Sequence, residues 1–477
     1  MGSSSTLTLT LIQMSVVTDS PVHSSGSDDF AAYLDEALDA NSSNSSSDEE
    51  AEGKNEFEDV RCSSSPISYY MNNDTSQVVS SNKRRKFEST EETEGSTSEG
   101  IVKHESESSV KVDVCTHPGS FGNMCICCGQ KLDEESGVTF GYIHKGLRLH
   151  DAEISRLRNT DMKKFLYSRK LYLVLDLDHT LLNTTILSHL SPEELHLHNE
   201  TDSLEDVSKG SLFKLEHMCM ITKLRPFVRT FLKEASEMFE MYIYTMGDRP
   251  YALEMAKLLD PQGEYFNGKV ISRDDGTQKH QKGLDIVFGQ ESAVLILDDT
   301  EHAWMKHKSN VILMERYHFF ASSCRQFGFN CKSLAETKSD ENEIDGALAK
   351  ILEVLKQIHS TFFDKLQGDL VDRDVRQVLS SVRGEILSEC VIVFSRINHG
   401  ALPTLQRVAQ QMGATCLTEL DPTVTHVVAT DAGTEKSRWA VKEKKFLVHP
   451  RWIEAANYFW QKQPEENFGL KKPTNNS

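Results

Sequence analysis

The sequence predicts an α/β chain in which two folded domains follow an acidic, disordered N-terminal region. Its 477 residues exceed the size of one average domain. Across residues 142–335, apolar runs typical of buried strands alternate with helical patterns, which indicates a parallel sheet with right-handed crossovers. A shorter alternation at residues 388–475 predicts a second, smaller α/β domain, and residues 336–387 predict a helical linker between the two.

The N-terminal region, residues 1–110, is dominated by Ser, Asp, Glu, Thr and Asn. Its brief apolar patches cannot offset the entropy of ordering, so we expect it to be disordered. Within it, Asn82-Lys-Arg-Arg-Lys-Phe87 predicts a nuclear import signal and a nuclear location, although short basic clusters also arise by chance. Met1 and Met14 both fit as the start of the chain, and Leu7–Ile12 is too short and lacks the basic flank of a signal peptide.

Composition and charge exclude several classes of function. The formal net charge of -20 argues against direct binding of nucleic-acid backbones and favours a neutral or basic protein partner. Ten cysteines without a secretory signal indicate a reducing, intracellular compartment with thiols that are free or metal-bound. No apolar run approaches the length of a membrane span, so no membrane association is expected.

The segment of residues 111–141 is rich in cysteine and histidine. Its spacing, C-x-H followed by C-x-x-C-G, has the ligand types of a zinc knuckle, and the glycine permits the tight turn that directs thiolates inward. Cys127 competes as a ligand, and a loop with free thiols is the alternative interpretation. The expected zinc ligands are Cys115, His117, Cys125 and Cys128.

Polar side chains follow the predicted strands of the first domain at the point where each strand ends. The strand Leu171–Leu175 precedes Asp176 and Asp178, two carboxylates whose mutual repulsion a divalent cation would relieve. The other strands are Met241–Thr245, which ends in a hydroxyl, Lys269–Ile271, and Ala293–Leu297, which precedes Asp298 and Asp299. Lys282 precedes the last of them. Because the carboxyl ends of parallel strands share one edge, the sequence predicts a magnesium site for phosphoryl transfer there.

This order of motifs resembles the haloacid-dehalogenase superfamily of phosphotransferases. Four segments sharpen the resemblance to phosphatases of the RNA polymerase II C-terminal domain (CTD): Asp176-Leu-Asp-His-Thr-Leu-Leu182, Thr222-Lys-Leu-Arg-Pro-Phe227, Tyr244-Thr-Met-Gly-Asp248 and Ile296-Leu-Asp-Asp299. The last domain resembles a BRCT domain through Gly413-Ala414, Thr425-His-Val-Val428 and Trp452, a tryptophan expected in the core. The combination is similar to the TFIIF-interacting CTD phosphatase family, including its plant CTD phosphatase-like members. The resemblance implies a Rossmann-like phosphatase domain followed by a small α/β BRCT domain.

Chemistry and the resemblance together give each site residue an expected role. Asp176 is the expected nucleophile, which forms an aspartyl-phosphate, and Asp178 is the expected general acid and base. Thr245, Lys282 and Arg273 are expected to hold the phosphoryl oxygens. The expected Mg²⁺ ligands are Asp176, the backbone carbonyl of Asp178, and Asp299, with Mn²⁺ or Co²⁺ as substitutes. Asp298 is expected to orient Lys282 or a metal-bound water, although either member of the acidic pair could contact the metal.

The BRCT-like domain offers hydroxyls and a lysine that suit a phosphopeptide pocket, namely Ser395, Thr434 and Lys436. The sequence departs from phosphopeptide-binding BRCT domains at Arg396, where those domains tend to have glycine. A plain protein-interaction module is the alternative.

The function that these features favour is a nuclear, Mg²⁺-dependent protein serine/threonine phosphatase that regulates transcription. The resemblance implies the phosphorylated heptad-repeat CTD as substrate and TFIIF as a partner. Neither Thr185–Leu212 nor Gly247–Lys279 is long enough for a large cap domain, and an open site favours a peptide substrate. The alternatives are a phosphatase for other nuclear phosphoproteins and a BRCT-based scaffold with weak catalysis.

Overall fold

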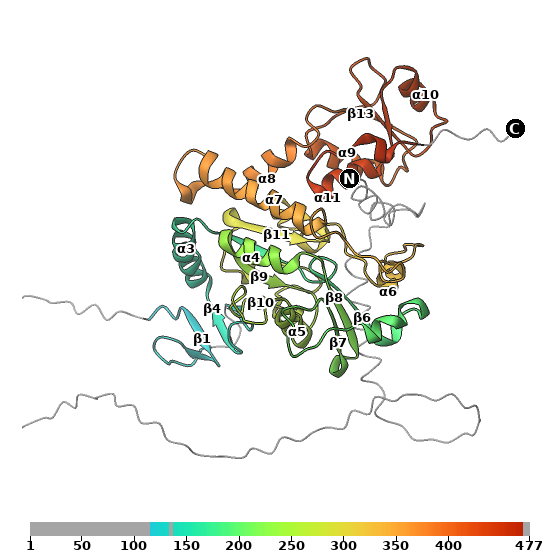
Figure 1. Ribbon diagram of the computed structural model, residues 1–477. Helices are drawn as coiled ribbons and strands as arrows, with labels where there is room; N and C mark the ends of the chain where they lie inside the picture. The colour runs from blue at the N-terminus through green and yellow to red at the C-terminus, as the bar shows by residue number, and fades with distance from the viewer. Residues whose placement is uncertain (1–114, 133–136, 471–477) are drawn as a thin grey trace, which may run out of the picture. The chain divides into compact units, whose positions relative to one another are not determined.

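The computed structural model of the chain describes residues 115–132 and 137–470 (Figure 1). The predictions for residues 1–110, including the basic cluster at 82–87, lie outside this part of the chain. Within the described ranges, no helix is both long enough and apolar enough to cross a membrane.

A five-stranded parallel sheet forms the centre of the first domain, in the order β10-β9-β5-β11-β12. Its strands are β5 (Leu171–Leu175), β9 (Phe239–Tyr244), β10 (Val270–Ile271), β11 (Val294–Asp298) and β12 (Val311–Leu313). All five residues of β5 are buried, as expected for a central strand covered on both faces. The predicted α/β class and parallel sheet are therefore confirmed, with strand ends shifted by one or two residues. The edge strand β12 was not predicted, because its three residues are too few to give a recognisable pattern.

Two helices flank β9 along the chain, because α4 leads into this strand and α5 follows it. Helix α4 (Val228–Met238) buries Val228, Phe231, Leu232 and Ala235, which is the spacing of one helical face. Helix α5 (Arg249–Leu259) begins at Asp248, whose side chain accepts a hydrogen bond from the backbone N–H of Tyr251. The cap fixes the first turn of α5 directly after the loop that ends β9.

A small antiparallel sheet follows the first loop, in the order β6-β8-β7. Its strands are β6 (Leu182–Ile186), β7 (Leu212–Leu215) and β8 (Met220–Leu224). The sequence does not predict this sheet, because Asn183, Thr184 and Thr185 interrupt the apolar pattern of its first strand. The hydroxyls of Thr184 and Thr222 instead bond to each other across the strands, 2.9 Å apart.

The predicted helical linker contains α7 (Ala347–Ser360) and α8 (Val375–Gly384). Helix α7 packs on α4 of the first domain and on α11 (Arg451–Phe459) of the last one, and α8 packs on α9 (Leu402–Gln411). One continuous apolar core extends from the central sheet through these helices into the last domain. The linker therefore joins the two domains through buried side chains.

The last domain contains a four-stranded parallel sheet in the order β14-β13-β15-β16. Its strands are β13 (Val391–Ser395), β14 (Thr415–Leu417), β15 (His426–Ala429) and β16 (Phe446–Val448), and helices α9, α10 (Glu435–Lys442) and α11 connect or follow them. Trp452 on α11 is fully buried and donates from its indole nitrogen to the carbonyl of Gln463 at 2.8 Å. The expected core position of this tryptophan is confirmed.

The described chain begins with a small antiparallel sheet in the order β2-β1-β4-β3. Its strands are β1 (Gly119–Phe121), β2 (Met124–Cys125), β3 (Val138–Thr139) and β4 (Leu147–Leu149), and helix α3 (Asp151–Tyr167) connects it to β5. The strands have only two or three residues each, so backbone pairing alone gives this sheet little stability.

A buried arginine joins separate parts of the first domain. Arg225, the first residue after β8, is fully buried and donates through Nε and NH2 to the two carboxylate oxygens of Glu341, at 2.9 and 2.6 Å. Its NH1 group donates to the carbonyls of Thr180 at 3.1 Å and Glu315 at 3.0 Å. One guanidinium thus connects the loop after β5, the segment after β12 and the start of the linker.

We predict that Glu341→Ala lowers the free energy of unfolding by about 3–5 kcal/mol, because it leaves the Arg225 charge buried without its counter-ion. Urea unfolding of the full chain measures the change. Glu343→Ala is the matched control, since Glu343 is exposed and two positions away. Equal unfolding midpoints for the two variants would contradict the role assigned to the Arg225–Glu341 pair.

Candidate functional site

The site lies where β5, β9 and β11 end at the carboxyl edge of the central sheet. The loop after β5 leaves the sheet with Asp176, whose backbone N–H still bonds to the carbonyl of Leu297 on β11 at 3.0 Å. The chain then turns tightly, since the N–H of Leu181 bonds to the carbonyl of Leu177 at 2.9 Å. His179 within this turn has a left-handed backbone, φ 63°. The turn keeps Asp176 and Asp178 at the same sheet edge, both nearly buried.

Lys282 lies between two of the predicted carboxylates. Its Nζ donates to Oδ1 of Asp176 at 2.5 Å and to Oδ2 of Asp298 at 2.7 Å. Burial alone would lower the pKa of Lys282, but Asp176 and Asp298 outweigh that effect and hold the pKa above its ordinary value. The indole nitrogen of Trp304 also donates to Oδ2 of Asp298, at 2.8 Å. Lys282 is therefore a fixed positive charge between the ends of β5 and β11.

Asp178 has a different set of partners. Its Oδ1 accepts a hydrogen bond from the phenol of Tyr251 at 2.5 Å, and its Oδ2 accepts one from the hydroxyl of Thr245 at 3.3 Å. Burial raises the pKa of Asp178 to about 6, while the Tyr251 hydrogen bond acts in the opposite direction. Thr245 is itself oriented by the backbone N–H of Gly247, which donates to its Oγ1 at 3.0 Å. The structure thus brings Asp176, Asp178, Thr245 and Lys282 together as predicted.

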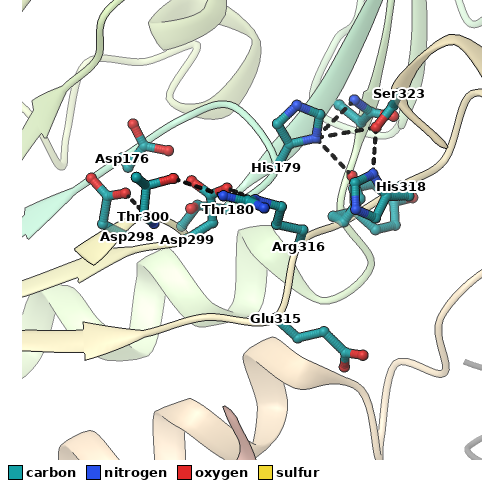
Figure 2. Close-up of polar contacts among 12 residues, drawn as sticks. Asp176, His179, Thr180, Asp298, Asp299, Thr300, Glu315, Arg316, His318 and Ser323 are labelled. Atoms are coloured by element: carbon teal, nitrogen blue, oxygen red, sulfur yellow. Dashed lines mark hydrogen bonds and ion pairs between the residues drawn. The ribbon is translucent and has the colours of Figure 1, made fainter. Parts of the chain in front are cut away.

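Asp299 bonds to an arginine from the segment after β12. Nε of Arg316 donates to Oδ2 of Asp299 at 2.5 Å, and NH2 donates to the hydroxyl of Thr300 at 3.2 Å. Burial would raise the pKa of Asp299, but Arg316 lowers it below the ordinary value. Figure 2 shows Asp176, Asp298 and Asp299 gathered on one side of this arginine, with Glu315 pointing away from them.

The carboxylates have the arrangement that a divalent cation requires. Asp176, Asp298 and Asp299 each offer one oxygen, and these oxygens lie within 4.8 Å of one another. The buried hydroxyl of Thr180 has no hydrogen-bond partner among the described residues, which leaves it available to a bound group. Hard oxygen ligands of this kind suit Mg²⁺. The residues present therefore fit the predicted metal.

The two members of the acidic pair differ in how their oxygens are used. Asp298 accepts the backbone N–H of Thr300 at Oδ1 and the Lys282 and Trp304 donors at Oδ2. The Arg316 contact of Asp299 uses Oδ2 only. This difference favours Asp299 as the metal ligand and Asp298 as the residue that orients Lys282, a choice the sequence left open.

Arg273 lies in the short helical turn η4 (Arg273–Asp275) after β10. Its backbone N–H donates to the carbonyl of Gly247 at 3.0 Å, so the loops after β9 and β10 are bonded to each other. Its contact with a phosphoryl group stays a prediction.

The residues of the predicted BRCT phosphate pocket are only partly brought together. The hydroxyls of Ser395 and Thr434 lie 2.8 Å apart, and Thr434 also caps α10 by accepting the N–H of Ser437. Nζ of Lys436 instead donates to the carbonyl of Thr418 at 2.6 Å. Arg396 has a left-handed backbone, φ 52°, and bonds to Asp431. The phosphate pocket stays a prediction. In this structure the hydroxyls of Ser395 and Thr434 bond to each other.

The four predicted zinc ligands also converge, although they lie in the small N-terminal sheet. One ligand atom from each of Cys115, His117, Cys125 and Cys128 lies within 4.8 Å of the others. The side chain of Cys127, which the sequence left as a competing ligand, is exposed.

Sequence reasoning missed three side chains that hydrogen-bond to the predicted carboxylates, namely Tyr251, Trp304 and Arg316. Tyr251 follows Asp248 and Pro250, which mark a helix start in the sequence, but nothing in the sequence shows that its phenol reaches Asp178. Arg316 follows a strand that the sequence did not reveal. The motif at 222–227 was noted only as part of a resemblance, and the structural role of Arg225 within it was not foreseen.

Comparison with known proteins agrees with this geometry. Residues 171–364 match the family model of NLI interacting factor-like phosphatases, and residues 382–456 match the BRCA1 C Terminus (BRCT) domain. The chain is 59% identical to Arabidopsis thaliana RNA polymerase II C-terminal domain phosphatase-like 4, over 96% of this chain and 98% of the relative. It is 42% identical to the Arabidopsis thaliana phosphatase-like 3 protein over 66% of this chain, which corresponds to 26% of that relative.

A solved structure shares the fold. The fission yeast RNA polymerase II CTD phosphatase Fcp1 bound to beryllium fluoride aligns with a TM-score of 0.53 and 24% identity, over 66% of this chain and all of that one. The shared elements, the two matched domains in this order and the identity along almost the whole length lead to one conclusion. The chain belongs to the family of RNA polymerase II C-terminal domain phosphatases.

Proposed function

We propose that the chain is a Mg²⁺-dependent protein serine/threonine phosphatase that hydrolyses phosphoserine in the heptad repeats of the RNA polymerase II CTD. We further propose that it acts in the nucleus, where this substrate is located, and that it proceeds through an aspartyl-phosphate. Relatives named as CTD phosphatases support the substrate. TFIIF remains an expected partner from the family resemblance alone.

The observation that carries the mechanism is the difference between the partners of Asp176 and Asp178. Burial raises the pKa of Asp176, whereas the ammonium of Lys282 acts in the opposite direction, and a bound Mg²⁺ would favour the ionised carboxylate that attacks phosphorus. Asp178 is bonded by two neutral hydroxyls, and burial raises its pKa to about 6, so it can carry a proton near neutral pH. Two acids with different environments can divide the roles of nucleophile and general acid.

The reaction then follows in two displacements. A carboxylate oxygen of Asp176 bonds to phosphorus as the bond from phosphorus to the seryl oxygen breaks, and Asp178 donates its proton to that oxygen. Asp178 next accepts a proton from water, whose oxygen bonds to phosphorus as the bond to Asp176 breaks, and inorganic phosphate leaves. Thr245 and Lys282 donate to the phosphoryl oxygens throughout. Mg²⁺, held by Asp176, Asp299 and the carbonyl of Asp178, would supply positive charge that stabilises the transferring phosphoryl group.

We predict that Asp176→Asn reduces phosphate release from phospho-heptad peptides by at least about 1,000-fold, because an amide cannot form the acyl-phosphate. Malachite-green assays of the full chain measure this release. Asp372→Asn, at an exposed position, is the control and should retain full turnover. Turnover by Asp176→Asn would contradict the role of Asp176 as nucleophile. No turnover by the folded native chain would favour the BRCT-based scaffold, and faster hydrolysis of unrelated phosphoserine peptides would favour other phosphoproteins as substrates.

We predict that Asp299→Asn raises the Mg²⁺ concentration for half-maximal activity at least about 10-fold, because it replaces a charged metal ligand. Asp298→Asn is the paired variant, and it should lower kcat through misplacement of Lys282 with a smaller change in Mg²⁺ dependence. Titration of activity with Mg²⁺ measures both constants. A larger change in Mg²⁺ dependence for Asp298→Asn than for Asp299→Asn would exchange the roles assigned to the two acids.

We predict that Tyr251→Phe lowers kcat about 10-fold, since a hydrogen bond to a charged group contributes about 1.5 kcal/mol or more. The variant loses the donor that holds Asp178 while keeping the ring. Tyr265→Phe serves as the control, because no contact links Tyr265 to the catalytic acids. Steady-state kinetics with one phosphopeptide compare the variants, and an unchanged kcat for Tyr251→Phe would remove Tyr251 from the positioning of Asp178.

A further inference from the structure

The small N-terminal sheet holds a second cluster of metal-binding side chains, far in sequence from the catalytic acids. Cys115 and His117 precede β1, Cys125 ends β2, and Cys128 follows in the next turn. Sγ of Cys115 lies 3.8 Å from Sγ of Cys125, and Sγ of Cys128 lies 3.4 Å from Nδ1 of His117. The hairpin between β1 and β2 thus brings both halves of the motif together.

These distances match the edges of a zinc tetrahedron. With Zn–S of about 2.3 Å and Zn–N of about 2.0–2.1 Å, a tetrahedral ion separates two sulfurs by about 3.8 Å and a sulfur from a nitrogen by about 3.6 Å. A disulfide would require the two sulfurs to lie at about 2.0 Å. The separation of 3.8 Å between Cys115 and Cys125 therefore fits a shared ion and excludes a bond between them.

Backbone N–H groups around the cluster donate hydrogen bonds to two of its sulfur atoms. The N–H of His117 donates to Sγ of Cys115, and the N–H of Cys127 donates to Sγ of Cys125, each at 3.4 Å. The turn closes at Gly129, whose N–H bonds to the carbonyl of Cys125 and whose φ of 72° favours glycine. This turn brings Cys125 and Cys128 into one cluster with Cys115 and His117, and Cys127 is not part of that cluster.

We propose that Cys115, His117, Cys125 and Cys128 bind one structural zinc ion. Four protein ligands complete the tetrahedron and leave no open position, which distinguishes a structural ion from a catalytic one. The sheet also requires such an ion, since strands of two or three residues enclose too little apolar surface to be stable alone.

The zinc-bound sheet supports the turn that follows the catalytic lysine. Beyond β3, Phe140 stacks on Phe288 with ring centroids 4.8 Å apart, and the phenol of Tyr142 donates to the carbonyl of Ile286 at 2.8 Å. Arg158 of α3 donates to the carbonyls of Leu284, Asp285 and Val287. These contacts meet η5 (Leu284–Ile286), which begins two residues after Lys282, and the next two residues, Val287 and Phe288. The ion thus acts on the catalytic site only through the placement of this turn.

Metal analysis of the full chain, purified without a histidine tag, tests the proposal. We expect about one zinc per chain and an X-ray absorption spectrum with three sulfur ligands and one nitrogen ligand. A chain without zinc that also fails to take up added Zn²⁺ would overturn the proposal. A spectrum with four sulfur ligands would overturn it as well, because it would replace His117 by Cys127.

Matched cysteine variants locate the ion. Cys128→Ser should lose at least nine-tenths of the zinc, whereas Cys127→Ser, one residue away and outside the cluster of four ligands, should retain it. Amide hydrogen exchange at residues 284–287 should accelerate at least 10-fold in Cys128→Ser and stay unchanged in Cys127→Ser. Zinc loss from Cys127→Ser with retention in Cys128→Ser would overturn the assignment of ligands.

If Cys128→Ser does not fold, titration of the native chain with a mercurial tests whether cysteine thiols hold the zinc. A colorimetric zinc indicator should report the release of one equivalent of zinc as three thiols react. Release without reaction of these thiols would place the ion elsewhere and overturn the proposal.

Discussion

The catalytic site depends on the placement of one buried ammonium group between two buried carboxylates. Without Lys282, Asp176 and Asp298 would repel each other at the ends of adjacent strands, and burial would favour their protonation. The two carboxylates must lie close together, because β5 and β11 pair directly and end at the same level of the sheet. The chain therefore has to supply positive charge at this edge, and it does so from the segment between β10 and β11 and from the segment after β12. A bound divalent cation would add further positive charge at this edge, which Lys282 and Arg316 already supply.

Much of this site is readable from the sequence for a simple physical reason. Buried parallel strands are apolar runs, so an abrupt change to carboxylates at Asp176 and Asp298 marks both the strand end and the site. The same reasoning predicted Thr245 at the end of the next strand. The apolar runs also predicted the parallel sheet. The helical spacing of apolar residues in α7 predicted the helical linker.

The remaining features depend on contacts that no local pattern encodes. Strands β6 and β12 are short or carry polar residues, so their periodicity is too weak to detect. Tyr251 reaches Asp178 across 73 positions of sequence, and Arg225 reaches Glu341 across 116. The choice between Asp298 and Asp299 as metal ligand likewise required the hydrogen-bond partners of each oxygen, which only coordinates provide. Sequence thus predicts which chemical groups are present, and tertiary structure determines which of them share a partner.

The segment after β12 shows why the motif residues alone do not make the site. The N–H of Met314 bonds to the carbonyl of Asp298, the carbonyl of Glu315 accepts from Arg225, and the N–H of Tyr317 bonds to the carbonyl of His179. Arg316, between them, pairs with Asp299. Four consecutive residues therefore hold the loop after β5 and the end of β11 at a fixed separation, although none belongs to a catalytic motif. Since Arg225 also binds Glu341 at the start of the linker, the distances among the acids depend on how the linker packs. The motif residues supply the proposed reacting groups, whereas this segment and the linker set the distances between them.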